Sequence, residues 1–525
     1  VKMAASYKYG IDFGTTNSSI ALHYDVGNRG VMENCVFKVD QNLSYRELLP
    51  SIVYLDAMGE TCVGTRGRNK YMSEEVPEQW KTLIKKVKLQ LDRYKDDVEV
   101  ARFAGKAYKV SDVIALLLRE LKAKADREHA VKVNGTVFGV PVNYDDGCKR
   151  VMLEAAVKAG FFKNFKEAER GVEFLSEPVA VALDYGVDLN SDKNVFVFDF
   201  GGGTLDMAVV KLSKTTDGRG KHEVIGKSRI TLGGEQYTEL FFKKAFIKKY
   251  GRMKLIEAFG YDHTLSVHEL WERLGKDVLG VKFIDELDKA KCELSYEDDI
   301  LFSWAEADAD RIIRIHCQLT RKEFEQAIKD SLDDIQIAVQ DCLSEIGITM
   351  GKIDEVLMAG GSSLVPIIIK TVRGIFGDAK VRNPSNNALT SIVKGLAVRG
   401  YREDEEEWLE DVADSDYGLW LAREQRVETI VKKNTRISDT YLDKRNLDSG
   451  KSRDVHAIND RIPEVIVYQN SEKIGHFSLP YRGSGQYRIF FEVDKKHGWL
   501  TVYIYDRGTM QWYDDVLEHK IRIQY

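Results

Sequence analysis

Two segments of this chain read alike, although they lie far apart in the sequence. Residues 11–18 (Ile-Asp-Phe-Gly-Thr-Thr-Asn-Ser) and 198–206 (Phe-Asp-Phe-Gly-Gly-Gly-Thr-Leu-Asp) each end an apolar strand in Asp-Phe-Gly. A turn of small residues and a second apolar strand follow in both cases. An internal echo of so long a period predicts two similar lobes rather than a stack of short repeats.

The chemistry of these turns points to a phosphate and a cation. Glycines and small residues let backbone N–H groups approach an anion, and the hydroxyls of Thr15, Thr16 and Thr204 add donors. Carboxylates beside a phosphate repel it unless a divalent cation lies between them, so we expect Asp12 and Asp199 to hold Mg²⁺ partly through water. A structural hairpin is the alternative for either turn alone, and the matching pair favours the phosphate site.

Size, charge and cysteine usage exclude several classes of protein. The chain has 525 residues, 43% of them hydrophobic, which allows for about three to four domains. Its net charge of −6 argues against a nucleic-acid partner. We find no apolar run long enough for a membrane span and no secretory signal. The six cysteines form no C-x-x-C pair, so we expect reduced thiols and a cytoplasmic location.

The pattern of strands and helices changes near residue 400. An α/β pattern precedes that point, whereas residues 415–525 contain β-rich segments separated by turns, which is typical of an all-β sandwich. Residues 402–414 form an acidic run that we expect to be solvated and extended. We therefore predict a bilobal domain over residues 7–400, a linker over 401–414 and a sandwich over 415–525.

A third glycine turn lies at residues 358–363 (Met-Ala-Gly-Gly-Ser-Ser), between a predicted strand and a predicted helix. Its glycines would let a base or ribose lie against the backbone, and a plain strand-to-helix turn is an equal alternative. We find no Walker-type G-x-x-x-x-G-K-[ST] sequence and no G-x-G-x-x-G after a strand. The P-loop and dinucleotide-binding classes therefore have no support.

In this order, the motifs resemble those of the DnaK-type seventy-kilodalton heat-shock chaperone family. The resemblance extends through residues 175–186, 231–235, 288–295 and 431–435, and covers nearly the whole chain. Sugar kinases and actins share the phosphate turns but lack the C-terminal sandwich. The resemblance implies an actin-like α/β ATPase domain, duplicated and ribonuclease-H-like, followed by an all-β sandwich. It also implies ATP or ADP with Mg²⁺ as cofactors, K⁺ as a further candidate, and binding and release of extended apolar peptide.

The resemblance assigns roles to individual residues. It makes Lys85 the catalytic lysine, on a helix over residues 82–87, with Lys86 as the next match and a solvated helix lysine as the alternative. The catalytic set is then Asp12, Lys85, Glu177, Asp199, Thr204 and Asp206. The nucleotide-binding set is Gly14, Thr15, Thr16, Asn17, Gly201, Gly202, Gly203, Thr204, Gly233, Gly234, Glu235, Asp288, Lys291, Ser295, Gly360, Gly361 and Ser362.

The chain departs from the family's pattern around the base and at the sites that couple domains. Leu364 stands where an arginine commonly stacks on adenine, and Cys292 also replaces a usual base-facing residue, which predicts weaker nucleotide affinity. Pro141 fits the family's switch proline, and Lys149 takes the place of an interdomain arginine. Glu173 reverses the charge of an arginine that helps to engage a J-domain co-chaperone, which argues against standard engagement.

The predicted sandwich ends with the sequence, and the family's helical lid is absent from it, through either a cut or a natural lack. Leu419 and Leu421 are candidates for the peptide groove, and plain sandwich core is an equal alternative. Two alternative functions compete with the chaperone hypothesis. One is a nucleotide-binding scaffold with weak or uncoupled ATPase activity, and the other is a small-molecule kinase, which the sandwich disfavours.

Overall fold

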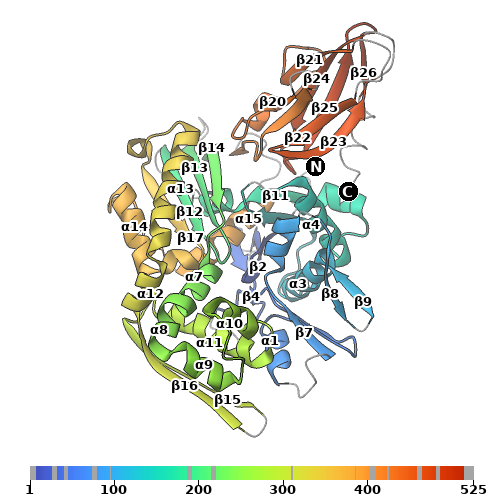
Figure 1. Ribbon diagram of the computed structural model, residues 1–525. Helices are drawn as coiled ribbons and strands as arrows, with labels where there is room; N and C mark the ends of the chain where they lie inside the picture. The colour runs from blue at the N-terminus through green and yellow to red at the C-terminus, as the bar shows by residue number, and fades with distance from the viewer. Residues whose placement is uncertain are drawn as a thin grey trace.

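A computed structural model describes residues 7–25, 32–40, 45–73, 80–94, 96–103, 105–142, 144–185, 192–214, 220–308, 311–384, 386–401, 409–421, 425–457, 464–479 and 485–513. Two α/β lobes face each other, and a β-rich module lies at one end of the pair (Figure 1). Among the described residues, no helix is both long enough and apolar enough to cross a membrane.

The first lobe is built on a mixed sheet of strand order β11-β10-β1-β2-β3. Alternating apolar residues of β1, among them Ile11 and Phe13, are buried beneath the helices that cover the sheet. Its strands are β1 (Tyr7–Phe13), β2 (Asn17–Asp25), β3 (Met32–Val36), β4 (Leu49–Pro50), β10 (Val133–Val140) and β11 (Val172–Ser176). Smaller sheets use β5 (Val53–Asp56), β6 (Thr61–Val63), β7 (Lys81–Ile84), β8 (Glu99–Phe103) and β9 (Lys106–Lys109). The helices are α1 (Gly64–Ser73), α2 (Val87–Tyr94), α3 (Val110–Ala125), α4 (Asp146–Lys158), α5 (Phe165–Gly171) and α6 (Glu177–Tyr185).

The second lobe has a sheet of order β17-β12-β13-β14-β18. Its strands are β12 (Lys193–Phe200), β13 (Leu205–Lys214), β14 (Gly220–Ile230), β17 (Glu355–Ala359) and β18 (Leu409–Glu410). A long hairpin, β15 (Asp299–Asp308) and β16 (Arg311–Thr320), extends from the helices. These helices are α7 (Gly234–Phe241), α8 (Ile247–Tyr250), α9 (Arg252–Phe259), α10 (Val267–Leu274), α11 (Val278–Glu293), α12 (Arg321–Ile328), α13 (Asp330–Ile346), α14 (Pro366–Phe376) and α15 (Ser391–Tyr401).

The two echoing segments take the same place in the two sheets. β1 pairs antiparallel with β2 and parallel with β10, and β12 pairs antiparallel with β13 and parallel with β17. Asp12 and Asp199 therefore both lie near the carboxyl end of a central strand, just before a glycine turn. Helices α6 and α15 pack against each other, and the Cβ position of Gly395 would overlap the carbonyl of Ala180, so only glycine permits this approach.

The segment that carries Lys85 differs from the sequence prediction. A helix was expected over residues 82–87, but Lys81–Ile84 form strand β7, which pairs with β5, and the helix begins only at Val87. Lys86 lies between the two elements with a φ of 58°. This left-handed conformation turns the chain before α2 begins, so the lysines before and after it face different surroundings.

The β-rich module consists of two four-stranded antiparallel sheets that share one core. Their orders are β20-β19-β22-β23 and β21-β24-β25-β26. Leu419, Val467, Ile489 and Val502 from both sheets belong to that core. The strands are β19 (Tyr417–Leu421), β20 (Arg426–Val431), β21 (Lys451–Ala457), β22 (Glu464–Gln469), β23 (Glu472–Ser478), β24 (Gly485–Val493), β25 (Leu500–Asp506) and β26 (Gln511–Tyr513).

The groove prediction for Leu419 is wrong in this conformation. Its side chain is 1% exposed and packs in the module's core, so it does not line an open groove. The alternating pattern of β19 predicted a buried face and a groove face equally well, and the core took Leu419. The side chain of Leu421 lies outside the described part of the chain.

The acidic run is not solvated over the part that is described. Leu409 and Glu410 form β18, which pairs parallel with His222 and Glu223 of β14, and Val412 is buried. The apolar residues of the run dock it on the second sheet, and that burial outweighs the tendency of the charges to stay in water. Residues 402–408 of the predicted linker lie outside the described residues.

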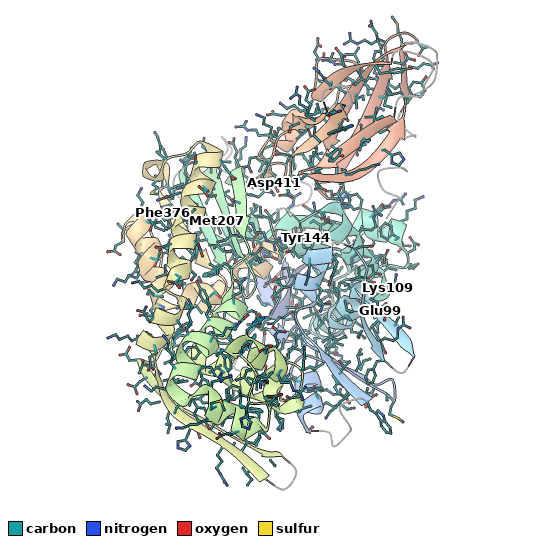
Figure 2. All side chains as sticks on the ribbon, in the orientation of Figure 1. Glu99, Lys109, Tyr144, Met207, Phe376 and Asp411 are labelled. Atoms are coloured by element: carbon teal, nitrogen blue, oxygen red, sulfur yellow. The ribbon has the colours of Figure 1, made fainter. Side chains whose placement is uncertain are left out.

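Two buried lysines hold the end of this segment (Figure 2, Asp411). Lys227 Nζ lies 3.0 Å from Asp411 Oδ1 and 2.5 Å from Asp414 Oδ1. Lys149, which the resemblance places at the position of an interdomain arginine, has its Nζ 3.9 Å from Asp414 Oδ2. Burial alone would raise the pKa of Asp414, but Lys227 and then Lys149 hold it below its ordinary value.

Candidate functional site

A pocket of about 370 Å³ lies between the two lobes, where the three glycine turns meet. It is in the size range of small-molecule sites. It brings together most of the residues singled out from the sequence, although they come from distant parts of the chain. These are Asp12, Gly14, Thr15, Thr16, Asn17, Glu177, Asp199, Gly201, Gly202, Gly203, Thr204, Gly234, Glu235, Asp288, Lys291, Ser295, Gly360, Gly361 and Ser362.

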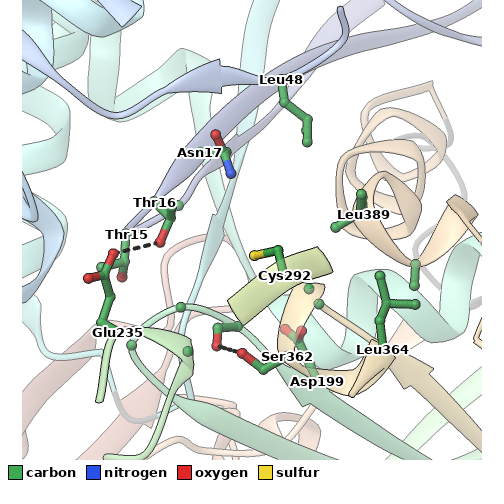
Figure 3. A pocket seen from close by; sticks show the side chains of 18 of the residues that line it. Thr15, Thr16, Asn17, Leu48, Asp199, Glu235, Cys292, Ser362, Leu364 and Leu389 are labelled. Atoms are coloured by element: carbon green, nitrogen blue, oxygen red, sulfur yellow. Dashed lines mark hydrogen bonds between the residues drawn. The ribbon is translucent and has the colours of Figure 1, made fainter. Parts of the chain in front are cut away.

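The first two turns approach each other so closely that side chains would not fit. A Cβ on Gly202 would overlap the hydroxyl of Thr16, and one on Gly203 would lie 3.0 Å from Thr15 Oγ1. Thr16 Oγ1 also donates to Glu235 Oε1 of the other lobe at 3.3 Å (Figure 3). The glycines thus leave backbone and hydroxyl groups around a space that an anion could occupy.

The third turn and the loop before α7 support the second turn from behind. The Glu235 backbone N–H donates to the Gly202 carbonyl at 2.8 Å, and Ser362 Oγ donates to the Gly201 carbonyl at 2.8 Å. Gly360 has a φ of 78°, and a Cβ there would overlap the Phe200 carbonyl. Gly233 does not itself line the pocket, but a Cβ on it would overlap the Gly202 carbonyl, so its place is structural.

The carboxyl groups of Asp12, Glu177 and Asp199 all line the pocket. Burial, and then the charge of Glu177, raises the pKa of Asp12 to about 7. Burial, followed by the charges of Glu177 and Asp206, raises the pKa of Asp199 well above its ordinary value. Like charges collected in a buried place favour a cation that would neutralise them.

The residues fit a cation held only in part by the protein. Asp199 Oδ1 is buried and has no hydrogen-bond partner, which is unusual for a carboxylate oxygen and consistent with a ligand in the pocket. Among the described residues, no three His, Cys, Asp or Glu side chains are grouped closely enough to hold a metal ion by themselves. An ion here would therefore need oxygens from water or phosphate as well.

Lys88, not Lys85, is the lysine that lies beside Asp12 and Glu177 in the pocket. Lys88 lies in the first turn of α2, and its Nζ lies 2.5 Å from Glu177 Oε1, with both side chains buried. Burial alone would lower the pKa of Lys88, but the charges of Glu177 and Asp12 raise it. Lys85 lies away from the pocket and pairs with Asp285 at 2.8 Å, so its assignment as the catalytic lysine is wrong.

The sequence held a weak signal for Lys88. Val87 and Leu91 of α2 are both buried, at a spacing of four residues. A helix begun at Val87 would have placed Lys88 beside that buried face. A helix predicted from residue 82 does not place Lys88 beside the buried face.

Asp206 lies behind the pocket rather than in its wall. It accepts hydrogen bonds from the Val142 backbone N–H at 2.8 Å and from Thr204 Oγ1 at 2.7 Å. Burial raises its pKa to about 6 even though Arg229 opposes the rise. Asp206 thus joins the second turn to the chain that follows Pro141, and it does not line the pocket as the catalytic set expected.

Asp288 and Lys291 form a closed network at the pocket's edge. Lys291 Nζ lies 2.6 Å from Asp288 Oδ1, and it donates to Thr238 Oγ1 at 2.8 Å and to the Gly234 carbonyl at 2.9 Å. All three donors of the ammonium group are therefore used inside the protein. The network fixes α11 against α7 and shapes the wall next to the second turn.

The charge reversal at Glu173 is compensated inside the fold. The side chain is buried in β11, where its Oε2 lies 3.6 Å from Lys8 Nζ and its Oε1 accepts from Arg399. The backbone N–H of the next residue, Phe174, donates to the Lys496 carbonyl of the β-rich module at 3.0 Å. Glu173 therefore presents no free negative charge in this conformation.

Comparison with known proteins matches the chain to a family. The family model described as Hsp70 protein matches residues 8–520, which is nearly the whole chain.

Proposed function

The chain belongs to the Hsp70 family, and on that basis we propose that it is an ATPase whose hydrolysis of ATP is coupled to binding and release of extended apolar peptide. Members of this family are ATP-dependent chaperones with an actin-like ATPase fold. The observation that carries the proposal is the meeting of two glycine turns, each preceded by an aspartate at the end of a central strand, in one pocket between the lobes. The matching strand pairings of the two sheets support a duplicated ATPase domain.

The residues of the pocket would bind and orient the reactants. Thr15, Thr16 and the backbone of residues 201–204 would bind phosphate oxygens, while Asp12 and Asp199 would hold water around Mg²⁺. The ion, when bound, supplies positive charge against the phosphates. Lys88 would add a second positive charge, and Glu177 would orient Lys88 and a water.

The docked linker supports the proposed coupling. β18 extends the sheet that contains Asp199, and β13 and β14 lie between them. A change at the second turn can therefore reach the linker through two hydrogen-bonded strands. Coupling requires that nucleotide favour either the docked or the released linker by differential contacts.

A nucleotide-binding scaffold with uncoupled ATPase is the second candidate, and the burial of Leu419 favours it. The rate of phosphate release should be measured with Mg²⁺ and ATP, with and without a reduced, unfolded apolar peptide. Stimulation by peptide supports the coupled chaperone. A basal rate that peptide leaves unchanged supports the scaffold, and phosphate transferred to a small molecule would support a kinase instead.

We also propose that the chain binds peptide, uses K⁺ as a cofactor and lies in the cytoplasm. All six cysteines are free, as a reducing compartment would require. The burial of Glu173 supports the proposal that a standard J-domain is not engaged in this conformation.

A further inference from the structure

The wall of the pocket is divided into two ends of different chemistry. The turns, the carboxylates and the threonine hydroxyls form a polar end. The opposite end is apolar, and Figure 3 shows Leu48, Leu364 and Leu389 across the pocket from Thr15, Thr16 and Glu235. Tyr45, Cys292, Tyr296, Val365 and Ala388 also line the pocket.

Both lobes contribute to the apolar end. Tyr45 and Leu48 come from the first lobe, and Tyr296 follows α11 in the second lobe. Both tyrosines line the pocket, and Tyr45 acts together with burial to raise the pKa of Tyr296. A flat group at this end would therefore be enclosed by apolar side chains from both lobes.

Few polar groups at this end are free to read the edge of a base. Lys291 already has three partners, and Ser362 Oγ donates to the Gly201 carbonyl. Desolvation at the pocket wall raises the pKa of the Cys292 thiol, so this otherwise exposed residue stays neutral at pH 7. Ser295 also lines the pocket, and its hydroxyl makes no hydrogen bond with the described part of the chain.

The phosphates of a nucleotide occupy the polar end under the proposed function, on which this inference rests, so the base falls at the apolar end. We infer that the site takes purine nucleoside triphosphates as a class, holding the base by its faces and discriminating little between adenine and guanine. A site that pairs with a base edge rejects the wrong partner by a factor of about 10⁴–10⁵, whereas apolar fit alone gives about 10–200. Because adenine and guanine are similar in size, we expect the factor by which the site discriminates between them to fall at or below the lower end of that range.

The test is a calorimetric titration of the full chain with ATP and with GTP, both with Mg²⁺. We expect dissociation constants within about tenfold of each other. A preference for ATP of a hundredfold or more overturns the inference and leaves the proposed function intact. If neither nucleotide binds while circular dichroism shows a folded protein, both the inference and the proposed function fail.

Two variants locate the base. Leu364→Arg brings a cation over the base and should tighten ATP and GTP alike, by about 2- to 30-fold. Ser295→Ala should change the ratio of the two dissociation constants by less than about threefold. If Leu364→Arg tightens one purine only, or if Ser295→Ala removes a preference that the wild type shows, the base is read by its edge and the inference is wrong.

Discussion

Lys88 Nζ lies 2.5 Å from Glu177 Oε1, inside the pocket where the two lobes meet. The pair joins the first turn of α2 to the first turn of α6. Both residues are buried next to Asp12, whose charge also acts on Lys88. A lysine held in this way can stabilise negative charge that develops on a phosphate, because its ammonium group is already positioned and desolvated.

Lys88→Met should therefore lower the turnover number of the ATPase by about 10²–10³-fold. Lys85→Met is the matched control, since Lys85 pairs with Asp285 outside the pocket and should stay within about threefold of wild type. Steady-state phosphate release measures both. A large loss in Lys85→Met with little effect of Lys88→Met would reverse the assignment.

The raised pKa of Asp12 predicts how the nucleotide-free protein responds to pH. Its folded value is about 7 against an ordinary 3.8, so the folded state binds the proton more tightly than the unfolded chain does. The contribution favours folding below about pH 4 and is lost as the pH rises to about 7, by an amount on the order of a few kcal/mol.

Melting temperatures at pH 5 and pH 7.5, without nucleotide or metal, test this. Asp12→Asn removes the charge, so its melting temperature should fall less than that of wild type between the two pH values, and it should exceed wild type at pH 7.5. Exposed Asp341→Asn on α13 serves as the control and should follow wild type. Parallel pH profiles for Asp12→Asn and wild type would refute the prediction.

Lys227 should hold the linker in its docked place. Lys227→Met leaves Asp411 without its lysine and Asp414 with only the more distant Lys149. Because an uncompensated buried charge costs several kcal/mol, we expect protease cleavage within residues 402–414 to become at least about tenfold faster.

Lys221→Met is its control, since Lys221 lies exposed on the same strand, β14. Cleavage should be followed with ATP and with ADP. Equal rates in wild type and Lys227→Met would show that the ion pairs do not fix the linker, and equal rates with both nucleotides would remove the nucleotide dependence from the proposed coupling.

Glu173→Arg, which introduces the residue common in the family, should destabilise this chain. The new cation would be buried beside Lys8 and Arg399, with the carboxylate that pairs with them removed. We expect a loss of about 3–5 kcal/mol in the free energy of unfolding.

Chemical denaturation of Glu173→Arg and of exposed Glu297→Arg would measure the effect. The Glu297→Arg control should stay within about 0.5 kcal/mol of wild type. If Glu173→Arg is as stable as wild type, then the two cations have other partners and the buried pairing carries no stability.

Local sequence was enough where residue types alone determine the arrangement. Asp12 and Asp199 could be placed at strand ends because apolar runs and glycine turns fix the strands on both sides. Lys88 was missed by three positions, since the start of α2 depends on the left-handed backbone at Lys86 and on packing of the first lobe. No local sequence pattern predicts a left-handed backbone conformation at a lysine.

Long-range pairing explains the remaining differences. The charge of Glu173 is balanced by Lys8 and Arg399, which lie 165 and 226 positions away in the sequence. The burial of Val412 likewise depends on β14, so a charge run that reads as solvated becomes a strand. Such partners are invisible until the chain is folded.

The pairing of β18 with β14 also protects the second lobe from unwanted association. Release of the linker would leave the backbone groups of β14 at His222 and Glu223 without their strand partner, and an uncovered edge strand attracts other extended chains. A molecule whose linker is released would thus expose an unpaired strand edge. Its β-rich module would also be free to move relative to the two lobes. A long lifetime of the released form should therefore favour aggregation at high protein concentration. A short peptide with the sequence of residues 409–412 should suppress that aggregation.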